Sequence, residues 1–197
     1  MRLIITRHGE TIENKEGIIQ GHLPGKLSEE GIEQAKKVAL RLKDEKIDFA
    51  FSSDLARSAD TAREIMKFHK DAPIEFTKEL RERFLGEIQG KRKSELGFGE
   101  QKYVAARDNL KGAETLEELF KRAESFVDKV LQKHHNHTVL FVGHNGINKA
   151  LIAAITGKTY EDIPNIENQK NTSVCIFEIE EDKKHRIHCF NCVKHLG

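Results

Sequence analysis

The chain has 197 residues, 33% of them charged, and its 33 Lys and Arg residues against 32 Asp and Glu residues leave a net charge of +1. This length suits one domain, so we expect residues 1–197 to form a single domain that buries roughly 70% of the surface of the unfolded chain. The near-zero charge excludes a general attraction to nucleic acid or acidic membranes, and no segment approaches the roughly 20 apolar residues of a transmembrane helix. We therefore expect a cytoplasmic protein with no nucleic-acid or membrane partner and a local site for any anion.

The first predicted element is a buried strand that ends in a five-residue motif. The apolar run at residues 3–6 leads into Arg7-His8-Gly9-Glu10-Thr11. In open α/β sheets ligands bind beyond the carboxyl ends of strands, so Arg7 and His8 are candidate site residues. The planar donor fork of arginine suits phosphate oxygens, and imidazole can act as a nucleophile or a base. The motif therefore predicts phosphoryl chemistry, and a surface turn is the alternative.

The next part of the chain predicts two helices that flank a strand. Ser28 is a candidate N-cap residue, and apolar residues follow it at helical spacing as far as Leu42. Residues 47–51 are expected to form a strand. The polar residues 52–54 are expected to cap a following helix that carries Arg57 in its first turn.

The second half of the chain repeats the order of strand, histidine and helix. Residues 115–118 match a capping box, and apolar residues at helical spacing continue as far as Leu131. Residues 138–142 predict a buried strand, which is followed by Gly143-His144-Asn145-Gly146 and a helix over residues 147–155. A second histidine is thus expected where a strand gives way to a helix.

Strands that alternate with helices predict a largely parallel sheet with both faces covered. Two further apolar runs, residues 174–179 and 186–190, predict a closing pair of strands. The expected fold class is α/β, a three-layer α/β/α sandwich with a largely parallel central sheet.

Six sequence blocks, in this order, resemble the histidine phosphatase superfamily, whose branches include cofactor-dependent phosphoglycerate mutases and many small-molecule phosphatases. The resemblance covers most of the chain, and six ordered blocks are far more specific than any one of them. The blocks are Arg7–Thr11, Leu27–Gly31, Ser52–Ala62, Leu80–Gly86, Val142–Gly146 and Asn171–Val174.

The resemblance implies that His8 attacks the phosphorus atom and becomes a phosphohistidine. It also implies that Arg7, Arg57 and His144 clamp the phosphate oxygens. Two nearby arginines would lower the pKa of His8 and keep its lone pair available for attack. Backbone N–H groups at the start of the helix after His144 are expected to add further donors to the phosphate.

The leaving alkoxide needs a proton, for which a carboxyl group close to the phosphate is the usual source. By its position in the matched block, Glu82 is the expected acid, and Glu79 is the substitute candidate. Asn145 stands where many family members have glycine, which bears on how closely the backbone approaches the phosphate. The expected substrate-binding residues are Arg7, Asn14, Gln20, Gly21, Arg57, Glu82, His144 and Asn145.

The predicted function is hydrolysis of phosphomonoesters of small metabolites by a metal-independent phosphatase that uses no cofactor. The phosphoglycerate mutases of this superfamily carry an additional basic, proline-containing segment before the late helix. Residues 101–112 of this chain are short and free of proline, which favours hydrolysis over mutase chemistry. Two alternatives stay open. One is a phosphoglycerate mutase, and the other is a module that binds phosphorylated partners without turnover. The expected partner is a phosphorylated small molecule.

Histidines and cysteines gather near the C-terminal end of the sequence and could suggest zinc. His188 and Cys189 are neighbours on a predicted strand, so their side chains point to opposite faces, and a second Cys-x-x-Cys pair is missing. No metal site is therefore expected. Three cysteines form no secreted disulfide framework, which agrees with a reducing compartment. The basic run at residues 91–93 is a solvated face or a contact for an anionic substrate tail.

Overall fold

The computed structural model describes residues 1–96, 110–180 and 184–197 and contains a six-stranded sheet in the order β3-β2-β4-β1-β5-β6. The first four strands in that order run parallel, whereas β5 pairs antiparallel with both β1 and β6. The expected largely parallel sheet with a closing pair is confirmed. The strands are β1 (Arg2–Arg7), β2 (Phe49–Ser53), β3 (Ile74–Thr77), β4 (Thr138–Gly143), β5 (Val174–Ile179) and β6 (His185–Cys192).

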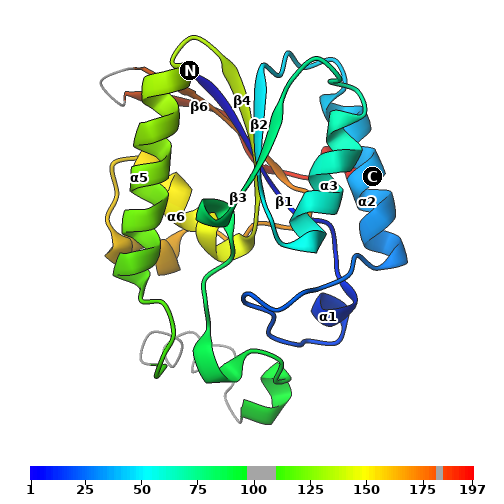
Figure 1. The fold of residues 1–197 in the computed structure, drawn as a ribbon, viewed down its shortest axis with the longest axis vertical. Coiled ribbons are helices and arrows are strands. Elements are labelled where there is room, and N and C mark those ends of the chain that lie inside the picture. Colours follow the sequence, from blue (N-terminus) through cyan, green and yellow to red (C-terminus); the bar gives the residue numbers. More distant parts are fainter. Residues whose placement is uncertain (97–109, 181–183) are drawn as a thin grey trace.

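Helices cover both faces of the sheet and complete the expected three layers (Figure 1). Two long helices, α2 and α3, pack together on one face, and α5 and α6 pack together on the other. The α-helices are α1 (Ile12–Lys15), α2 (Glu29–Leu42), α3 (Ala56–Met66), α5 (Leu116–His134) and α6 (Asn145–Ile155). Short 3-10 helices are η1 (Lys78–Leu80), η2 (Gly86–Ile88), η3 (Lys93–Leu96), η5 (Tyr160–Asn165) and η6 (Lys194–Leu196).

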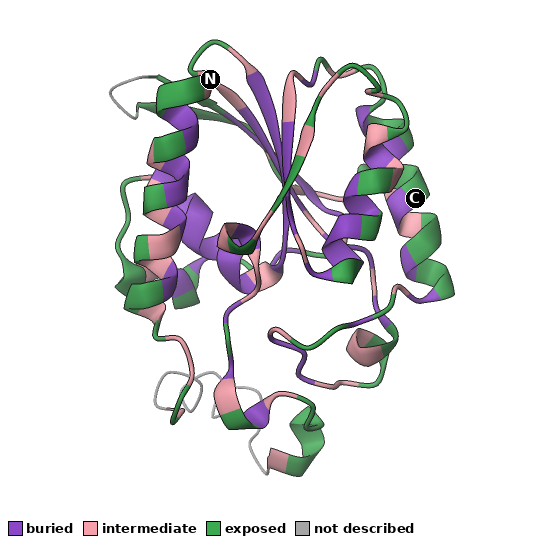
Figure 2. Cartoon of the chain, viewed as in Figure 1, coloured by how far each residue is buried: buried purple, intermediate pink, exposed green. Residues whose placement is uncertain are grey.

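The first strand shows why its sequence is apolar without interruption. Leu3 and Ile5 belong to the core cluster between the sheet and α5 and α6, whereas Ile4 belongs to the cluster on the side of α2 and α3. Successive side chains of a strand point to opposite faces, so a strand covered on both faces needs apolar residues at every position. Figure 2 shows the same arrangement, with the buried sides of the helices turned toward a buried sheet.

The predicted helix starts at residues 28 and 115 are confirmed. The Oγ of Ser28 accepts a hydrogen bond from the N–H of Gly31 at 3.0 Å. Thr115 and Glu118 form the reciprocal capping box, because each side chain accepts from the backbone N–H of the other residue. These local bonds satisfy N–H groups that a helix start leaves without partners.

The expected cap of α3 is wrong. Residues 52 and 53 continue β2, which begins two residues later than predicted, because Ser53 pairs with Thr77 of β3. Leu55 is the N-cap residue of α3 and has no side-chain capping bond. The sequence pattern did not indicate β3 or α1, and α6 and β6 extend beyond their predicted bounds. Elements as short as β3 and α1 have too few residues to show a periodic pattern. The ends of longer elements depend on their partners in the fold, which a local pattern does not reveal.

The fold places the two strand-end histidines side by side. In the register of the central parallel pair, Arg7 of β1 lies opposite Gly143 of β4, and the N–H of His8 donates to the carbonyl oxygen of Gly143 at 3.1 Å. The loop around α1 and the segment around η2 lie beyond these carboxyl ends (Figure 1). Among the helices of the described residues, none has both the length and the apolar character needed to cross a membrane.

Candidate active site

Two buried histidines face each other at the carboxyl ends of β1 and β4. His8 is 3% exposed and His144 is fully buried, and their ring centroids lie 5.0 Å apart. Residues that follow neighbouring parallel strands must lie close together, so this proximity is a direct consequence of the sheet order.

His8 presents one ring nitrogen for chemistry. Its Nδ1 lies 2.7 Å from the carbonyl oxygen of Gly9, which can only accept, so Nδ1 carries the proton and the lone pair is on Nε2. Burial lowers the pKa of His8 well below 6.5, and the charges of Arg57 and Arg7 lower it further, against the opposing effect of the Gly9 contact. The imidazole is therefore neutral at neutral pH, as a nucleophile requires.

Arg57, in the first turn of α3, is 1% exposed and fixed on three sides. Its Nε donates to Nδ1 of His144 at 3.2 Å, and its terminal nitrogens donate to the carbonyl oxygens of Leu23 at 2.9 Å and Gly21 at 2.8 Å. Gly21 has a φ of 50°, a left-handed conformation that favours glycine. Burial lowers the pKa of Arg57 to about 10, so the guanidinium stays charged at neutral pH.

His144 has a defined tautomer as well. Because its Nδ1 accepts from Arg57, the neutral ring carries its proton on Nε2. That nitrogen is buried and has no hydrogen-bond partner among the described residues. Burial, followed by the charges of Arg57, His8 and Arg7, lowers the pKa of His144 well below 6.5. His144 can therefore donate one hydrogen bond to an acceptor placed beside His8.

Arg7 supplies the second cation. Its NH1 donates to the carbonyl oxygen of Gln169 at 2.7 Å, and its buried Nε lacks a partner among the described residues. Burial lowers the pKa of Arg7, and the nearby charge of Glu82 opposes that shift. Two guanidinium groups beside a neutral imidazole create a site suited to a phosphate dianion.

Glu82 lies at the start of α6. Its Oε1 accepts from the N–H groups of Gly146 at 2.9 Å, Ile147 at 3.2 Å and Arg83 at 2.9 Å. The side chain of Glu82 therefore occupies the amides of Gly146 and Ile147, two of the helix-start amides that were expected to donate to phosphate. The partial positive charge of a helix N-terminus favours a carboxylate there.

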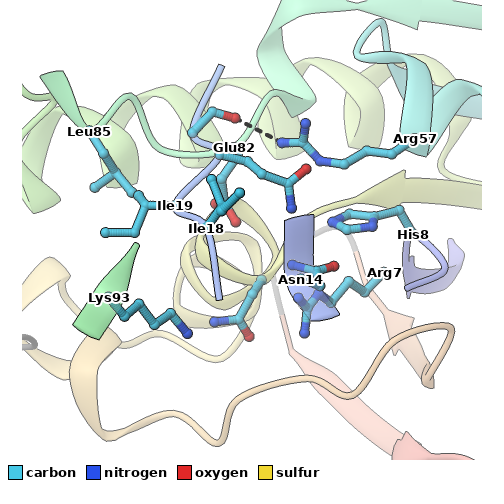
Figure 3. Close-up of a pocket in the computed structure, with 12 residues that line it drawn as sticks. Arg7, His8, Asn14, Ile18, Ile19, Arg57, Glu82, Leu85 and Lys93 are labelled. Atoms are coloured by element: carbon cyan, nitrogen blue, oxygen red, sulfur yellow. Dashed lines mark hydrogen bonds between the residues drawn. The ribbon is translucent and has the colours of Figure 1, made fainter. Parts of the chain in front are cut away.

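A cavity of about 130 Å³ joins these groups, and Figure 3 shows His8, Arg7 and Arg57 on one side of it and Ile18, Ile19 and Leu85 on the other. Seven of the eight expected substrate-binding residues line it. His144 is not among the lining residues and contacts the site through His8 and Arg57. The lining consists of Arg7, His8, Asn14, Ile18, Ile19, Gln20, Gly21, Arg57, Glu82, Leu85, Lys93 and Asn145.

The two candidate acids differ in position. Glu82 lines the cavity, whereas Glu79 does not belong to its lining, and its main-chain oxygen accepts from Arg122 at 2.6 Å. Sequence reasoning did not assign the apolar wall. The pair Ile18 and Ile19 in an otherwise polar loop was the available signal for it.

Lys93 belongs to the basic run for which two interpretations were open, and the structure places it in the cavity lining, extended toward the other labelled residues (Figure 3). Across residues 1–96, 110–180 and 184–197, no group of three or more His, Cys, Asp or Glu side chains is arranged to hold a metal. Near the end of the chain, His188 contacts Glu178 at 3.0 Å while Cys189 donates to the carbonyl oxygen of Val174 at 3.4 Å.

Comparisons with known proteins agree with this geometry. The family described as histidine phosphatase superfamily (branch 1) matches residues 3–192. Phosphoglycerate mutase-like protein 4 of Arabidopsis thaliana is 32% identical over 98% of this chain and 86% of its own. The metal-independent phosphoserine phosphatase of the same plant is 30% identical over 99% and 83%. The mycobacterial glucosyl-3-phosphoglycerate phosphatase solved with VO3 superimposes with a TM-score of 0.89 at 25% identity, covering 98% of this chain and 99% of its own.

Proposed function

The chain belongs to the histidine phosphatase superfamily, and we propose that this phosphatase hydrolyses phosphomonoesters of small metabolites through a phosphohistidine on His8. The observation that carries the mechanism is the state of His8. Its Nδ1 is held by the carbonyl of Gly9, its pKa is lowered by burial and two arginines, and its Nε2 lone pair is left for attack. A binding site for phosphate would need the arginines but would not need this nucleophile.

In the first step, Nε2 of His8 bonds to phosphorus while the bond from phosphorus to the ester oxygen breaks. Charge on the three equatorial oxygens is stabilised by Arg7, Arg57 and the Nε2–H of His144, since phosphoryl transfer depends on positioning and electrostatics. Protonated Glu82 gives its proton to the departing alkoxide. The products are the alcohol and phosphohistidine.

In the second step, water attacks the phosphohistidine, and the carboxylate of Glu82 takes a proton from that water. The bond from phosphorus to Nε2 breaks, inorganic phosphate leaves, and neutral His8 is restored. Splitting the transfer into two displacements lets the enzyme use the same clamp of Arg7, Arg57 and His144 twice.

This chemistry uses neither a metal nor an organic cofactor. A relative named as a metal-independent phosphoserine phosphatase supports this part of the proposal. The measurement is hydrolysis of p-nitrophenyl phosphate with and without EDTA, and equal rates are expected. A rate that falls with EDTA and returns with added metal would contradict metal independence.

The nucleophile is tested by removing it. His8→Ala is expected to abolish turnover and to abolish the acid-labile, base-stable label of a phosphohistidine, which rapid quenching in alkali with radiolabelled substrate detects. His135→Ala, at an exposed position beyond α5, is the matched control and should keep both. Turnover by His8→Ala at the wild-type rate would refute the assignment.

Two alternatives are decided by assays on the wild-type protein. One relative is named mutase-like, so interconversion of 2- and 3-phosphoglycerate after priming with a bisphosphate is measured in a coupled assay. Hydrolysis without interconversion is the expected result. Tight binding of phosphorylated ligands without release of phosphate would instead support a binding module. A panel of phosphorylated metabolites then ranks the substrates.

A further inference from the structure

A buried glutamine that lies outside the cavity lining holds one of the two site arginines. Gln169 is 1% exposed, and its main-chain oxygen accepts from NH1 of Arg7 at 2.7 Å. An arginine at the edge of a cavity has many rotamers, so a guanidinium that must meet phosphate oxygens needs a fixed partner on its far side. The carbonyl of Gln169 is such a partner.

The side chain and the N–H of Gln169 are fixed in turn. Its N–H donates to Oδ1 of Asn145 at 2.9 Å, and its Oε1 accepts from Nδ2 of Asn148 at 2.6 Å. Its Nε2 lies 3.1 Å from the Sγ of Cys175 on β5. Three contacts on a fully buried residue leave the loop before β5 little freedom at this point.

The same network holds the backbone that precedes Arg7. Nδ2 of Asn148 also donates to the carbonyl oxygen of Thr6 at 3.2 Å, and Asn148 itself is fully buried in α6. One amide therefore contacts both β1, just before Arg7, and Gln169, which holds the guanidinium. The position of Arg7 relative to α6, where His144 and Glu82 lie, is set through this pair of amides.

We propose that Gln169, which is held by a hydrogen bond from Asn148, is a positioning residue for phosphoryl transfer. It fixes the guanidinium of Arg7 beside the phosphate that is transferred. Gln169 is not itself a lining residue, and it contacts the lining through Arg7 and Asn145, of which only Arg7 carries a charge for the phosphate. The proposal rests on the proposed function. Stabilisation of charge in the transition state depends more strongly on exact placement of the guanidinium than substrate binding does. Loss of the Gln169 side-chain contacts should therefore lower kcat more than it raises KM.

The test is Gln169→Met, which keeps side-chain length and removes the amide. We expect kcat for p-nitrophenyl phosphate to fall about tenfold or more with KM changed less than about threefold, because small misplacements cost large factors in rate. Affinity for orthovanadate, measured by calorimetry, should fall with kcat, and affinity for inorganic phosphate should fall less. Gln132→Met, on the exposed side of α5, is the matched control and should leave all four quantities unchanged.

A double-mutant cycle separates positioning from general destabilisation. On an Arg7→Ala background, Gln169→Met should cause little further loss of vanadate affinity, because the charge that Gln169 positions is that of Arg7. Full additivity, or a folded Gln169→Met protein with kcat and vanadate affinity within about twofold of wild type, would overturn the proposal. If Gln169→Met does not fold, Asn148→Ala replaces it and should act in the same direction.

Failure of the proposed function gives a different result. A wild-type protein that neither hydrolyses aryl phosphate nor forms a phosphoenzyme would refute the function. The vanadate and phosphate affinities of the Gln169 and Arg7 variants would still decide whether Gln169 positions Arg7.

Discussion

At the scale of a single residue, the carboxyl group of Glu82 contacts both the cavity and the backbone of α6. It lines the cavity beside His8, and it accepts from the first amides of α6. In the proposed mechanism it gives its proton to the leaving oxygen while these backbone N–H groups still hold it in place. Its effect on rate should therefore depend on how much help the leaving group needs.

We expect Glu82→Gln to slow alkyl phosphates by about 10²–10⁴-fold and to slow p-nitrophenyl phosphate much less, since its phenolate leaves without a proton. The measurement is kcat/KM across a series of esters with different leaving-group pKa values. Glu79→Gln is the matched control and should keep the wild-type dependence. A uniform loss across the series would argue against Glu82 as the acid.

Lys93 lies at the side of the cavity away from His8 (Figure 3). A lysine there offers a point charge to a second anionic group of the substrate, and such charge-assisted contacts contribute about 1.5–3 kcal/mol. An aryl phosphate has no such group. Ile18, Ile19 and Leu85 line the same cavity. In the proposed function, Lys93 therefore acts on substrates whose organic part carries a second anionic group.

Lys93→Ala is expected to raise KM by roughly tenfold for substrates with a second carboxylate or phosphate and to leave p-nitrophenyl phosphate within about twofold. Lys91→Ala, at an exposed position in the same basic run, is the control. Equal increases in KM for both substrate types would contradict a specific contact between Lys93 and the second anionic group. They would indicate instead that the basic run acts through its overall electrostatic potential.

At the scale of elements, main-chain contacts hold the loop at residues 7–11 against the start of α2. Ser28 N–H donates to the carbonyl oxygen of Glu10 at 2.9 Å, and a Cβ built on Gly31 would overlap that same oxygen. A Cβ on Gly9 would in turn overlap the carbonyl oxygen of Gly31. The loop after β1 and the first turn of α2 can approach this closely because both positions are glycine.

We expect Gly31→Ala to lower the free energy of unfolding by about 1–3 kcal/mol, although alanine in an ordinary helix position is about 1 kcal/mol better than glycine. The loop that carries His8 must shift to make room, so kcat should fall as well. Urea unfolding and p-nitrophenyl phosphate kinetics measure both effects. Glu30→Ala, at the exposed neighbouring position, serves as the control, and a stabilised, fully active Gly31→Ala would contradict the packing.

Element boundaries also show which local signals were sufficient. The capping residues Ser28 and Thr115 act within four residues of chain, so sequence alone located α2 and α5. The serines at 52 and 53 have the same chemistry but lie in β2, because pairing with β3 and β4 extends the strand. Local propensity is weaker than strand pairing where the two compete.

At the scale of the whole molecule, the fold keeps two histidines neutral in its interior. The pKa values of His8 and His144 are both lowered well below 6.5, chiefly by burial. Below that pH the unfolded chain binds protons at these positions and the folded chain does not. Stability is therefore fully present above about 6.5 and is lost as the pH falls toward the folded-state pKa values.

We expect the free energy of unfolding to fall below pH 6.5 with a contribution of up to about 1.4 kcal/mol per pH unit from each of the two histidines. Urea unfolding followed by circular dichroism across the pH range measures the slope. His8→Asn should reduce that slope, and His135→Asn, at an exposed position, should not. Equal slopes in wild type and His8→Asn would contradict the burial of a neutral His8.

The sequence by itself determined the three-layer α/β class, the strand that delivers Arg7 and His8, and a set of residues that proved to share one cavity. Those features depend on residue patterns within a few helical turns or within one strand. They also depend on six ordered sequence blocks that resemble a single family, whose members share one fold. His8, Arg57 and Glu82 lie far apart in the chain, yet each belongs to one of these blocks, and the fold brings the three side chains to one cavity.

Only the tertiary structure decided that Glu82 occupies the first amides of α6, that Lys93 joins the cavity and that Gln169 holds Arg7. Each of these facts is a contact between segments with no shared local pattern. Gln169 and Arg7 are separated by 162 positions, and an amide in a loop has the same sequence signature whether it is solvated or buried. Such contacts arise from the packing of the completed sheet and helices, which the pattern of a single chain does not encode locally.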